Sequence, residues 1–450
     1  MMTLIYKIIT TVKLYSLRNS AYPLRSSAVC ILFVLYGLTI HAQRPTPAPT
    51  QTKSILITGG TIHVGDGTVI QNGDLGFKDG KITLVSTQKE AVAFDTTIDA
   101  TGKHVYPGFI LPNNLLGLNE VDAVRATQDY NERGEINPSV RALIGFNTDS
   151  KVIPTIRTNG VLYSQASPRG GLISGMSSVF RLDGWNWEDA VLKADDGIWL
   201  NWPPERFRTG WWVEPGEDEP NKKRREQLDQ LTLLLQRAKV FNQANVDVSL
   251  SALKGLFDGS KNLYVNVSRA KEIKECVLFF KDLGIKKIII CGGEESHLVA
   301  DFLKENDIPV LLDRLHSLPY KMDDAYDLPY TLPKYLQDAG VLFGLSYSGS
   351  METMGGRNLP FLAGTAVGFG LTKEQALQSI TLNTAKILGI DHSCGSLEIG
   401  KAASLFISTG DALDMMTNHV EIAFIDGRMI SLENHQQELY ERYKGKYGVE

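Results

Sequence analysis

The sequence predicts an α/β fold with a central parallel sheet and a smaller β-domain. The β-domain is built from the two ends of the chain that remain after a leader of about 42 residues. Two observations lead to this fold class. Residues 107–390 alternate apolar runs of strand length with stretches of helical spacing. The segments on either side of this region instead contain short β-branched runs separated by glycine turns. A composition of 43% hydrophobic and 22% charged residues in 450 is ordinary for a globular protein and gives enough chain for one large domain and a small satellite.

The first 42 residues look like a secretory signal peptide. Their basic residues, Lys7, Lys13, Arg18 and Arg25, precede an apolar run and no acidic residue interrupts them. The apolar run, 28–40, is about 13 residues long, against about 20 for a membrane span. Ala42 offers a small residue at a plausible cleavage point. We therefore expect a secreted or periplasmic protein without a stable membrane span, and an uncleaved N-terminal anchor is the alternative.

Residues 43–53 form a proline-rich spacer that should stay extended. The formal net charge is −5, and removal of the basic leader makes it more negative. An acidic surface argues against nucleic acid and anionic membranes as partners. Cys276, Cys291 and Cys394 remain in the mature chain without a CxxC pair, which indicates neither a disulfide framework nor a zinc knuckle.

The β-rich ends are predicted in order along the chain. Strands are expected over 54–63 and 72–82, with a hairpin turn at Asp79-Gly80, and over 98–103. At the other end strands are expected over 395–407 and 420–430. All are taken as short antiparallel strands of one composite β-sandwich made from 54–106 and 391–432, with a helical tail at 433–450.

The middle region is predicted to be a parallel sheet with right-handed crossovers. The expected strands are 285–290, 308–313 and 341–346, and the expected helices are 225–240, 294–305, 332–339, 359–369 and 373–381. Periodicity leaves both a closed barrel and an open doubly wound sheet possible. All six tryptophans lie between Trp185 and Trp212, and the charged stretch 214–224 is expected to be a solvated loop.

Several motifs in this order resemble the imidazolonepropionase-like branch of the amidohydrolase superfamily. They are Ile57-Thr58-Gly59-Gly60-Thr61-Ile62, Ile98 to Lys103, Tyr106 to Ile110, Thr381 to Ile390 and Gly395 to Leu405. The resemblance implies a distorted TIM (β/α)8 barrel over 107–390, with a β-sandwich formed by both termini. It also implies a divalent metal at the C-terminal ends of the strands that activates water for attack on a carbon–nitrogen bond.

The positions that match the family's metal ligands carry other residues. The two histidines of the first strand fall on Asn113 and Leu115, and those of the fifth and sixth strands fall on Asn266 and Cys291. The aspartate of the last strand falls near Tyr347. Amides and a leucine are poor or impossible ligands for such an ion. We therefore expect a divergent member with no metal and no other cofactor; zinc would be expected only if these positions are misaligned.

Other polar residues remain as candidates for chemistry or binding. Asp313, His316, Asp323 and Asp324 follow a predicted strand and form either a displaced site or a solvated acidic loop. The glycine-rich stretch 167–178, with Arg169 and Ser174, forms either an anion-binding nest or a plain connection. Trp185 and Trp187 either stack on a ligand, dock another subunit or pack a long loop.

Two functions follow from these residues. The first is an exported pseudoenzyme, a non-catalytic or metal-independent homologue that binds a small-molecule ligand or partners an active amidohydrolase, as a homo- or hetero-oligomer. The alternative is an active hydrolase that acts on non-peptide or cyclic amide carbon–nitrogen bonds.

Overall fold

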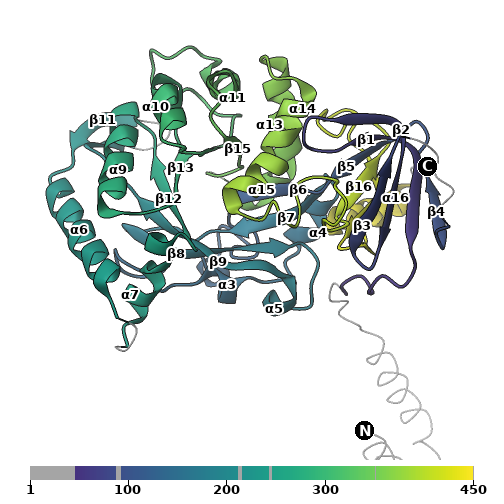
Figure 1. Cartoon of the computed structure of the whole chain (residues 1–450), viewed down its shortest axis with the longest axis horizontal. Coiled ribbons are helices and arrows are strands. Elements are labelled where there is room, and N and C mark those ends of the chain that lie inside the picture. Colours follow the sequence, from purple (N-terminus) through teal and green to yellow (C-terminus); the bar gives the residue numbers. More distant parts are fainter. Residues whose placement is uncertain (1–45, 88–92, 211–214, 243–245, 350, 449–450) are drawn as a thin grey trace, which may run out of the picture. The chain divides into compact units, whose positions relative to one another are not determined.

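Two eight-stranded sheets and one two-stranded sheet organise the described chain (Figure 1). The computed structural model describes residues 46–87, 93–210, 215–242, 246–349 and 351–448. The expected signal peptide, 1–42, and both tryptophans at 211–212 lie outside these residues. The segment from Pro47 to Glu450 clusters as one compact unit.

The first sheet joins the two ends of the described chain. Its strands follow the order β18-β17-β16-β5-β1-β2-β3, and β4 pairs with β1. They are β1 (Ile55–His63), β2 (Val69–Lys78), β3 (Lys81–Ser86), β4 (Thr96–Asp99), β5 (His104–Pro107), β16 (Leu405–Ser408), β17 (Val420–Ile425) and β18 (Arg428–Met429). The predicted turn at Asp79-Gly80 is confirmed, a second tight turn at Asp426-Gly427 joins β17 to β18, and β16 pairs antiparallel with β5.

Strand direction in this sheet corrects one expectation. We expected only antiparallel strands, but β4 and β5 both pair parallel with β1. A tight turn forces antiparallel pairing only between the strands that it connects, and β4 and β5 reach β1 from β3 rather than through such a turn.

The sheet curls strongly. Phe77 of β2 and Phe424 of β17 are four strand spacings apart in the sheet order, which is about 19 Å in a flat sheet. Their ring centroids are nevertheless 4.9 Å apart. Because the strands form one continuous sheet, the two-layered sandwich and its exact boundaries stay a prediction.

The second sheet is a nearly closed, TIM-like barrel with the order β15-β14-β13-β12-β9-β8-β7-β6. Its strands are β6 (Phe109–Asn114), β7 (Val161–Ala166), β8 (Ile173–Arg181), β9 (Val191–Asn201), β12 (Asn262–Val267), β13 (Ile288–Gly292), β14 (Val310–Leu312) and β15 (Phe343–Leu345). Neighbouring strands are parallel except that β8 runs antiparallel to β7 and β9. The expectation of a wholly parallel sheet is wrong here, because the connection from β7 to β8 is too short for a crossover.

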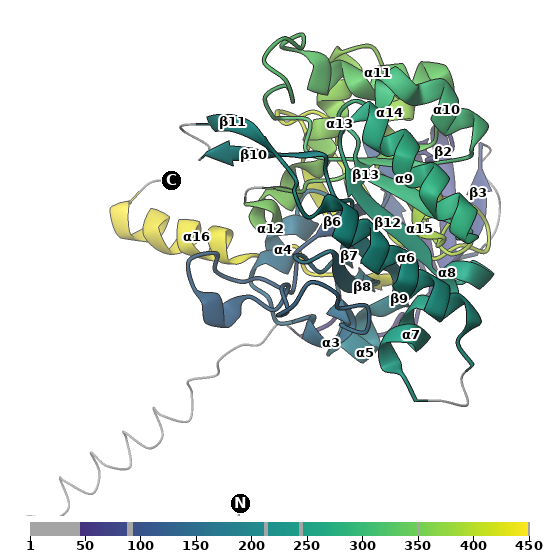
Figure 2. The ribbon, with the colours of Figure 1, turned by 90° about the vertical axis from the view of Figure 1, so that its left-hand side faces the viewer.

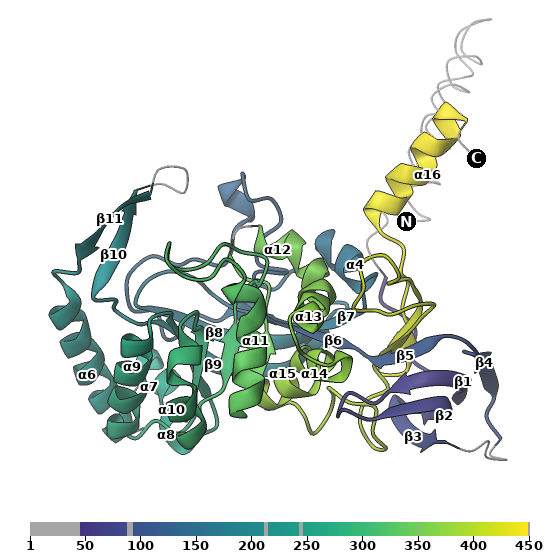
Figure 3. The ribbon, with the colours of Figure 1, turned by 90° about the horizontal axis from the view of Figure 1, so that it is seen from above.

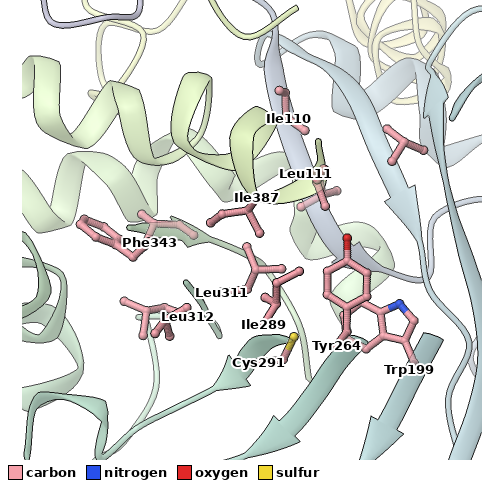
Figure 4. Close-up of a cluster of buried hydrophobic side chains, with 14 of the residues drawn as sticks. Ile110, Leu111, Trp199, Tyr264, Ile289, Cys291, Leu311, Leu312, Phe343 and Ile387 are labelled. Carbon is pink, nitrogen blue, oxygen red and sulfur yellow. The ribbon is translucent and has the colours of Figure 1, made fainter. Parts of the chain in front are cut away.

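The helix α15 (Leu382–Leu388) fills the opening between β15 and β6. The amide of Ile110 in β6 donates to the carbonyl of Ile380 just before this helix, at 2.9 Å. Figure 4 shows Ile387 between Phe343 of β15 and Leu111 of β6, and all three side chains are buried. The barrel interior is therefore a packed apolar core rather than a channel.

The remaining helices surround the barrel or project from it. They are α3 (Ala142–Gly145), α4 (Val152–Arg157), α5 (Trp187–Ala190), α6 (Arg224–Val240), α7 (Val248–Leu253), α8 (Gly255–Asp258), α9 (Ala270–Leu283), α10 (Ala300–Glu305), α11 (Leu328–Ala339), α12 (Glu352–Gly355), α13 (Leu359–Gly368), α14 (Lys373–Ser379) and α16 (His435–Tyr447). Across the described residues, a membrane-crossing helix of sufficient length and apolarity is not found.

The charged stretch 214–224 is not a plain loop, which corrects a second expectation. Strands β10 (Arg206–Gly210) and β11 (Pro215–Pro220) pair as an antiparallel hairpin that leads into α6. Cross-strand pairing satisfies the backbone of this charged segment outside the barrel. In Figures 2 and 3 this hairpin and α16 project on the same side of the molecule.

Candidate functional site

The C-terminal ends of the parallel strands meet at one end of the barrel, which we call the barrel mouth. Ligands bind at this end in TIM-type barrels because the loops that follow the strands converge there. In this chain the loops after β6, β7, β13, β14 and β15 bring buried polar side chains together at the mouth.

Asp313 follows β14 directly and is a half-buried carboxylate of the mouth. Its side chain accepts a hydrogen bond from the Ser348 hydroxyl. Burial raises the pKa of Asp313, and the Ser348 hydrogen bond and the charge of Arg169 only partly offset this effect. Asp313 is therefore a carboxylate that favours a proton or a cationic neighbour.

Glu294 approaches Asp313 across Gly292 at the end of β13. A Cβ atom on Gly292 would lie 3.3 Å from Glu294 Oε2 and 3.5 Å from Asp313 Oδ2, so both oxygens face the same point. Glu294 Oε2 is buried without a hydrogen-bond partner among the described residues. Burial, and then the nearby Asp313, raise the pKa of Glu294.

A cleft of about 320 Å³ opens beside these two carboxylates. Its polar wall is formed by Asp313, Glu294, Arg314 and Ser348. The rest of its lining is mainly apolar and comes from the loop after β14 and from α11, namely Leu315, Leu318, Pro319, Tyr320, Leu328, Pro329 and Leu332. An apolar lining with convergent polar groups is the usual form of a small-molecule site.

Comparison with known proteins identifies the scaffold. The Amidohydrolase family model matches residues 330–430. An imidazolonepropionase of Flavobacterium psychrophilum is 29% identical over 110 residues, which cover 23% of this chain and 27% of that protein. An imidazolonepropionase of Syntrophobacter fumaroxidans is 36% identical over 67 residues, 15% of this chain and 16% of that protein. The matched segments thus span about a quarter or less of these relatives.

A solved amidohydrolase of Thermotoga maritima shares the fold over most of the chain. It superimposes with a TM-score of 0.73 at 23% identity and covers 84% of this chain and 99% of that one. Residues 330–430 therefore match the amidohydrolase family, and most of the chain shares the fold of a solved amidohydrolase. The local similarity to imidazolonepropionases supports the branch that the motifs indicated.

The five positions that the motifs align with the family's metal ligands all lie in or beside strands of the barrel. Leu115 is buried just after β6 and has no donor atom. In β12, the Asn266 amide donates to Asn201 Oδ1 at 2.7 Å. Cys291 is buried in β13, where burial and Asp313 raise its pKa and keep it a thiol (Figure 4). The Tyr347 ring packs against Gly355, where a Cβ would lie 1.9 Å from it.

Asn113 shapes the tip of β6. Its φ of 51° is left-handed, and the pairing of β6 with β7 shifts between Leu111 and Asn114. Asparagine adopts this conformation more readily than most residues. The backbone amide of Asn113 donates to Gln165 Oε1 at 3.1 Å, and its backbone carbonyl accepts from Arg169. The side-chain Oδ1 is buried and has no hydrogen-bond partner among the described residues.

The other residues predicted with Asp313 do not gather around it. His316 Nε2 lies 2.7 Å from Thr365 Oγ1 of α13 and lines a different hollow. Asp323 is exposed, and Asp324 accepts from the Lys321 amide at 2.9 Å. Across the described residues, no group of three or more His, Cys, Asp or Glu side chains is placed to hold a metal ion.

The glycine-rich stretch 167–178 is not an open nest: residues 167–172 connect β7 to β8, and residues 173–178 belong to β8. The amides of Arg169 and Leu172 donate to the carbonyls of Tyr130 and Glu135, at 2.7 and 2.6 Å, so they are not offered to an anion. Ser174 is buried in β8 and accepts from the Asn201 amide at 3.4 Å. Trp185 is 68% exposed and Trp187 begins α5. Both follow the antiparallel strand β8 and therefore lie at the end of the barrel opposite the mouth.

Sequence reasoning missed Glu294 and Glu352. Glu294 follows the glycine pair 292–293 directly after a buried strand, a pattern that could have suggested a mouth residue. Glu352 begins the short helix α12 after β15 and pairs with Arg169 at 2.9 Å, 183 residues away in sequence. No local sequence pattern indicates a pair between residues so far apart in the chain.

A histidine pair at the junction of the terminal sheet and the barrel predicts a pH-dependent stability. His63 Nε2 lies 3.0 Å from His104 Nδ1, and His63 Nδ1 lies 2.7 Å from Glu374 Oε1 of α14. Burial, then His63 and Lys373, lower the pKa of His104 below 6.5, although Asp411 opposes this. His104 therefore binds fewer protons in the folded protein than in the unfolded chain, so its contribution to stability is fully present above pH 6.5 and decreases as the pH falls toward 5.

We expect the urea midpoint of His104→Asn to change less between pH 7 and pH 5 than that of the wild type. The matched control is His435→Asn, because His435 lies on the exposed helix α16. An identical pH dependence in wild type and His104→Asn would contradict the prediction.

Proposed function

We propose that this amidohydrolase-family protein binds a small molecule at the barrel mouth without a hydrolytic metal. The donor set carries this proposal: the positions equivalent to the family's ligands hold Asn113, Leu115, Asn266, Cys291 and Tyr347. Zinc and similar ions need imidazole, thiolate or carboxylate ligands at such a site. Leucine supplies none, the cysteine is held as a thiol, and the Asn266 amide group is already bonded to Asn201. These residues do not fit the metal, and we assign no step to it.

The cleft beside Asp313 and Glu294 is the proposed binding site. Two carboxylates with raised pKa values gain most from a ligand that brings a positive charge or hydrogen-bond donors. The apolar part of the lining suits a hydrophobic body on the same ligand. We therefore propose an amine or amidine class of ligand, in a protein that we also propose to be exported.

A second candidate function is metal-free hydrolysis of a carbon–nitrogen bond. The approach of Glu294 and Asp313 across Gly292 favours it, because two nearby carboxyl groups can divide into one acid and one base. In this case the ionised carboxylate would activate water and the protonated one would protonate the leaving nitrogen.

Metal analysis of protein purified without chelators tests the main proposal. We expect below about 0.1 zinc, manganese or iron per chain and an unchanged melting temperature in EDTA, since structural and catalytic metals stabilise the proteins that bind them. A histidine-containing imidazolonepropionase prepared in parallel is the control. Near-stoichiometric metal whose removal lowers the melting temperature would contradict the proposal. Amide hydrolysis that survives EDTA and is lost in Asp313→Asn would instead favour the second candidate.

A further inference from the structure

Arg169 extends from the β7–β8 connection into the barrel mouth. Its Nη2 donates to Glu352 Oε2 at 2.9 Å and to the Asn113 carbonyl at 3.2 Å. Its Nη1 donates to the Ser167 carbonyl at 3.2 Å, and the guanidinium carbon lies 5.7 Å from the ring centre of Trp199. These partners belong to β6, the end of β7, β9 and the helix α12 that follows β15.

The partners of Arg169 come from opposite parts of the barrel wall. In the sheet order, β15 and β6 are the two ends and β9 lies between them. A single group that reaches the tips of β6 and β9 and the helix after β15 must lie near the barrel axis. The charge of Arg169 also acts on Asp313 after β14 and on Cys291 in β13, where it opposes the effect of burial on both pKa values.

We propose that the Arg169 guanidinium is a resident cation of this barrel mouth, where Arg314 also lines the cleft, and that it supplies the positive charge that a metal ion supplies in other family members. This inference rests on the proposed function, in which the mouth holds no metal. The guanidinium is permanently charged, and it neutralises Glu352 by contact and Asp313 through space.

Loss of the Arg169 guanidinium should destabilise the ionised forms of the acidic groups that it neutralises. Glu352 is buried, and burial raises its pKa while Arg169 lowers it and Asp313 raises it further. Removal of the guanidinium leaves two enclosed carboxyl groups that repel each other when ionised. The space that it vacates is lined by carbonyl and carboxylate oxygens, which suit a planar cation with several donors.

Chemical rescue tests the proposal. We expect Arg169→Ala to lower the melting temperature by about 5 °C, because one buried charge loses its partner. Guanidinium chloride at about 20 mM, far below denaturing concentration, should restore at least half of this loss. Sodium chloride at the same concentration should not, and the wild type should gain nothing from guanidinium.

Arg141→Ala is the matched control, because Arg141 pairs with Asp195 at 2.8 Å but its side chain is 40% exposed. Guanidinium should not stabilise this variant. Rescue should also vanish in the double variant Arg169→Ala with Glu352→Gln. An Arg169→Ala protein that melts like the wild type, or that guanidinium does not stabilise, would overturn the inference.

If Arg169→Ala does not fold, Arg169→Lys and Arg169→Met provide the test. Both keep an unbranched side chain, and only lysine keeps the charge. The proposal requires the lysine variant to melt at least about 3 °C above the methionine variant, and equal melting temperatures would overturn it. Metal found in the wild type would contradict the proposed function, whereas failed rescue contradicts this inference alone.

Discussion

Replacement of Asp183 by Asn should lower the free energy of unfolding by about 3–5 kcal/mol, because it leaves the buried Arg157 guanidinium and the half-buried Arg428 guanidinium without this counter-charge. Asp183 accepts from Arg157 Nη1 at 3.1 Å and lies 3.2 Å from Arg428 Nη1. The Ala48 amide donates to the same carboxylate at 3.1 Å. Asp183 and Arg157 are only 8% and 7% exposed. One carboxylate thus ties the N-terminal segment, helix α4 and strand β18 together.

Urea unfolding at pH 7 measures this effect, since asparagine keeps the shape of the side chain and removes only its charge. Asp195→Asn is the control, because the Asp195 pair with Arg141 is partly exposed, at 21% and 40% of the two side chains, and should contribute below about 1 kcal/mol. Burial raises the pKa of Asp183 while both arginines lower it. Equal losses in the two variants would contradict the view that burial makes the Asp183 cluster costly to break.

The regular elements of this protein could be predicted because local patterns determine them. The apolar run at Ile288 to Ile290 and the run at Val310 to Leu312 are strands as expected. Helix α11 was found from its spacing, although it begins at Leu328 rather than 332. The direction of β8 was missed because the glycine-rich stretch 167–178 was interpreted as an anion-binding nest or a plain connection, and neither reading placed a strand within it. The brevity of this connection, with a strand on each side, is the pattern that indicates a hairpin.

The candidate site was harder to predict, because its members are distant in sequence. Asp313 could be found, since it follows a buried strand directly. Arg169 and Glu352 could be recognised as a pair only in three dimensions. The tryptophans show the opposite case, because residues that are neighbours in sequence prove to lie apart in the fold. Trp199 is buried in the barrel, whereas Trp185 is exposed at the end opposite the mouth. These residues are close in sequence but far apart in space, because β8 runs antiparallel and carries the chain to the end of the barrel opposite the mouth.

Replacement of Phe406 by Ala should destabilise the protein by about 3–5 kcal/mol, the cost typical of deleting a buried aromatic ring. Phe406 lies in β16 of the terminal sheet and is fully buried. Its ring packs edge-on against Phe109 of the barrel strand β6, with centroids 4.9 Å apart, and stacks on Tyr106 at 5.4 Å. It also covers Gly160, where a Cβ would lie 2.5 Å from the ring. The loss therefore opens a cavity between the terminal sheet and the barrel.

The same variant tests whether these two parts unfold together. Phe406, Ala423 and Ile425 of the terminal sheet belong to the hydrophobic core of the barrel. Because this core is shared, Phe406→Ala should shift a single calorimetric transition to lower temperature rather than split it. Phe207→Ala on the exposed hairpin β10–β11 is the control and should leave the transition within about 0.5 kcal/mol of the wild type. Two separate transitions in Phe406→Ala, with only the one assigned to the terminal sheet moved, would show that the sheet and the barrel are independent folding units.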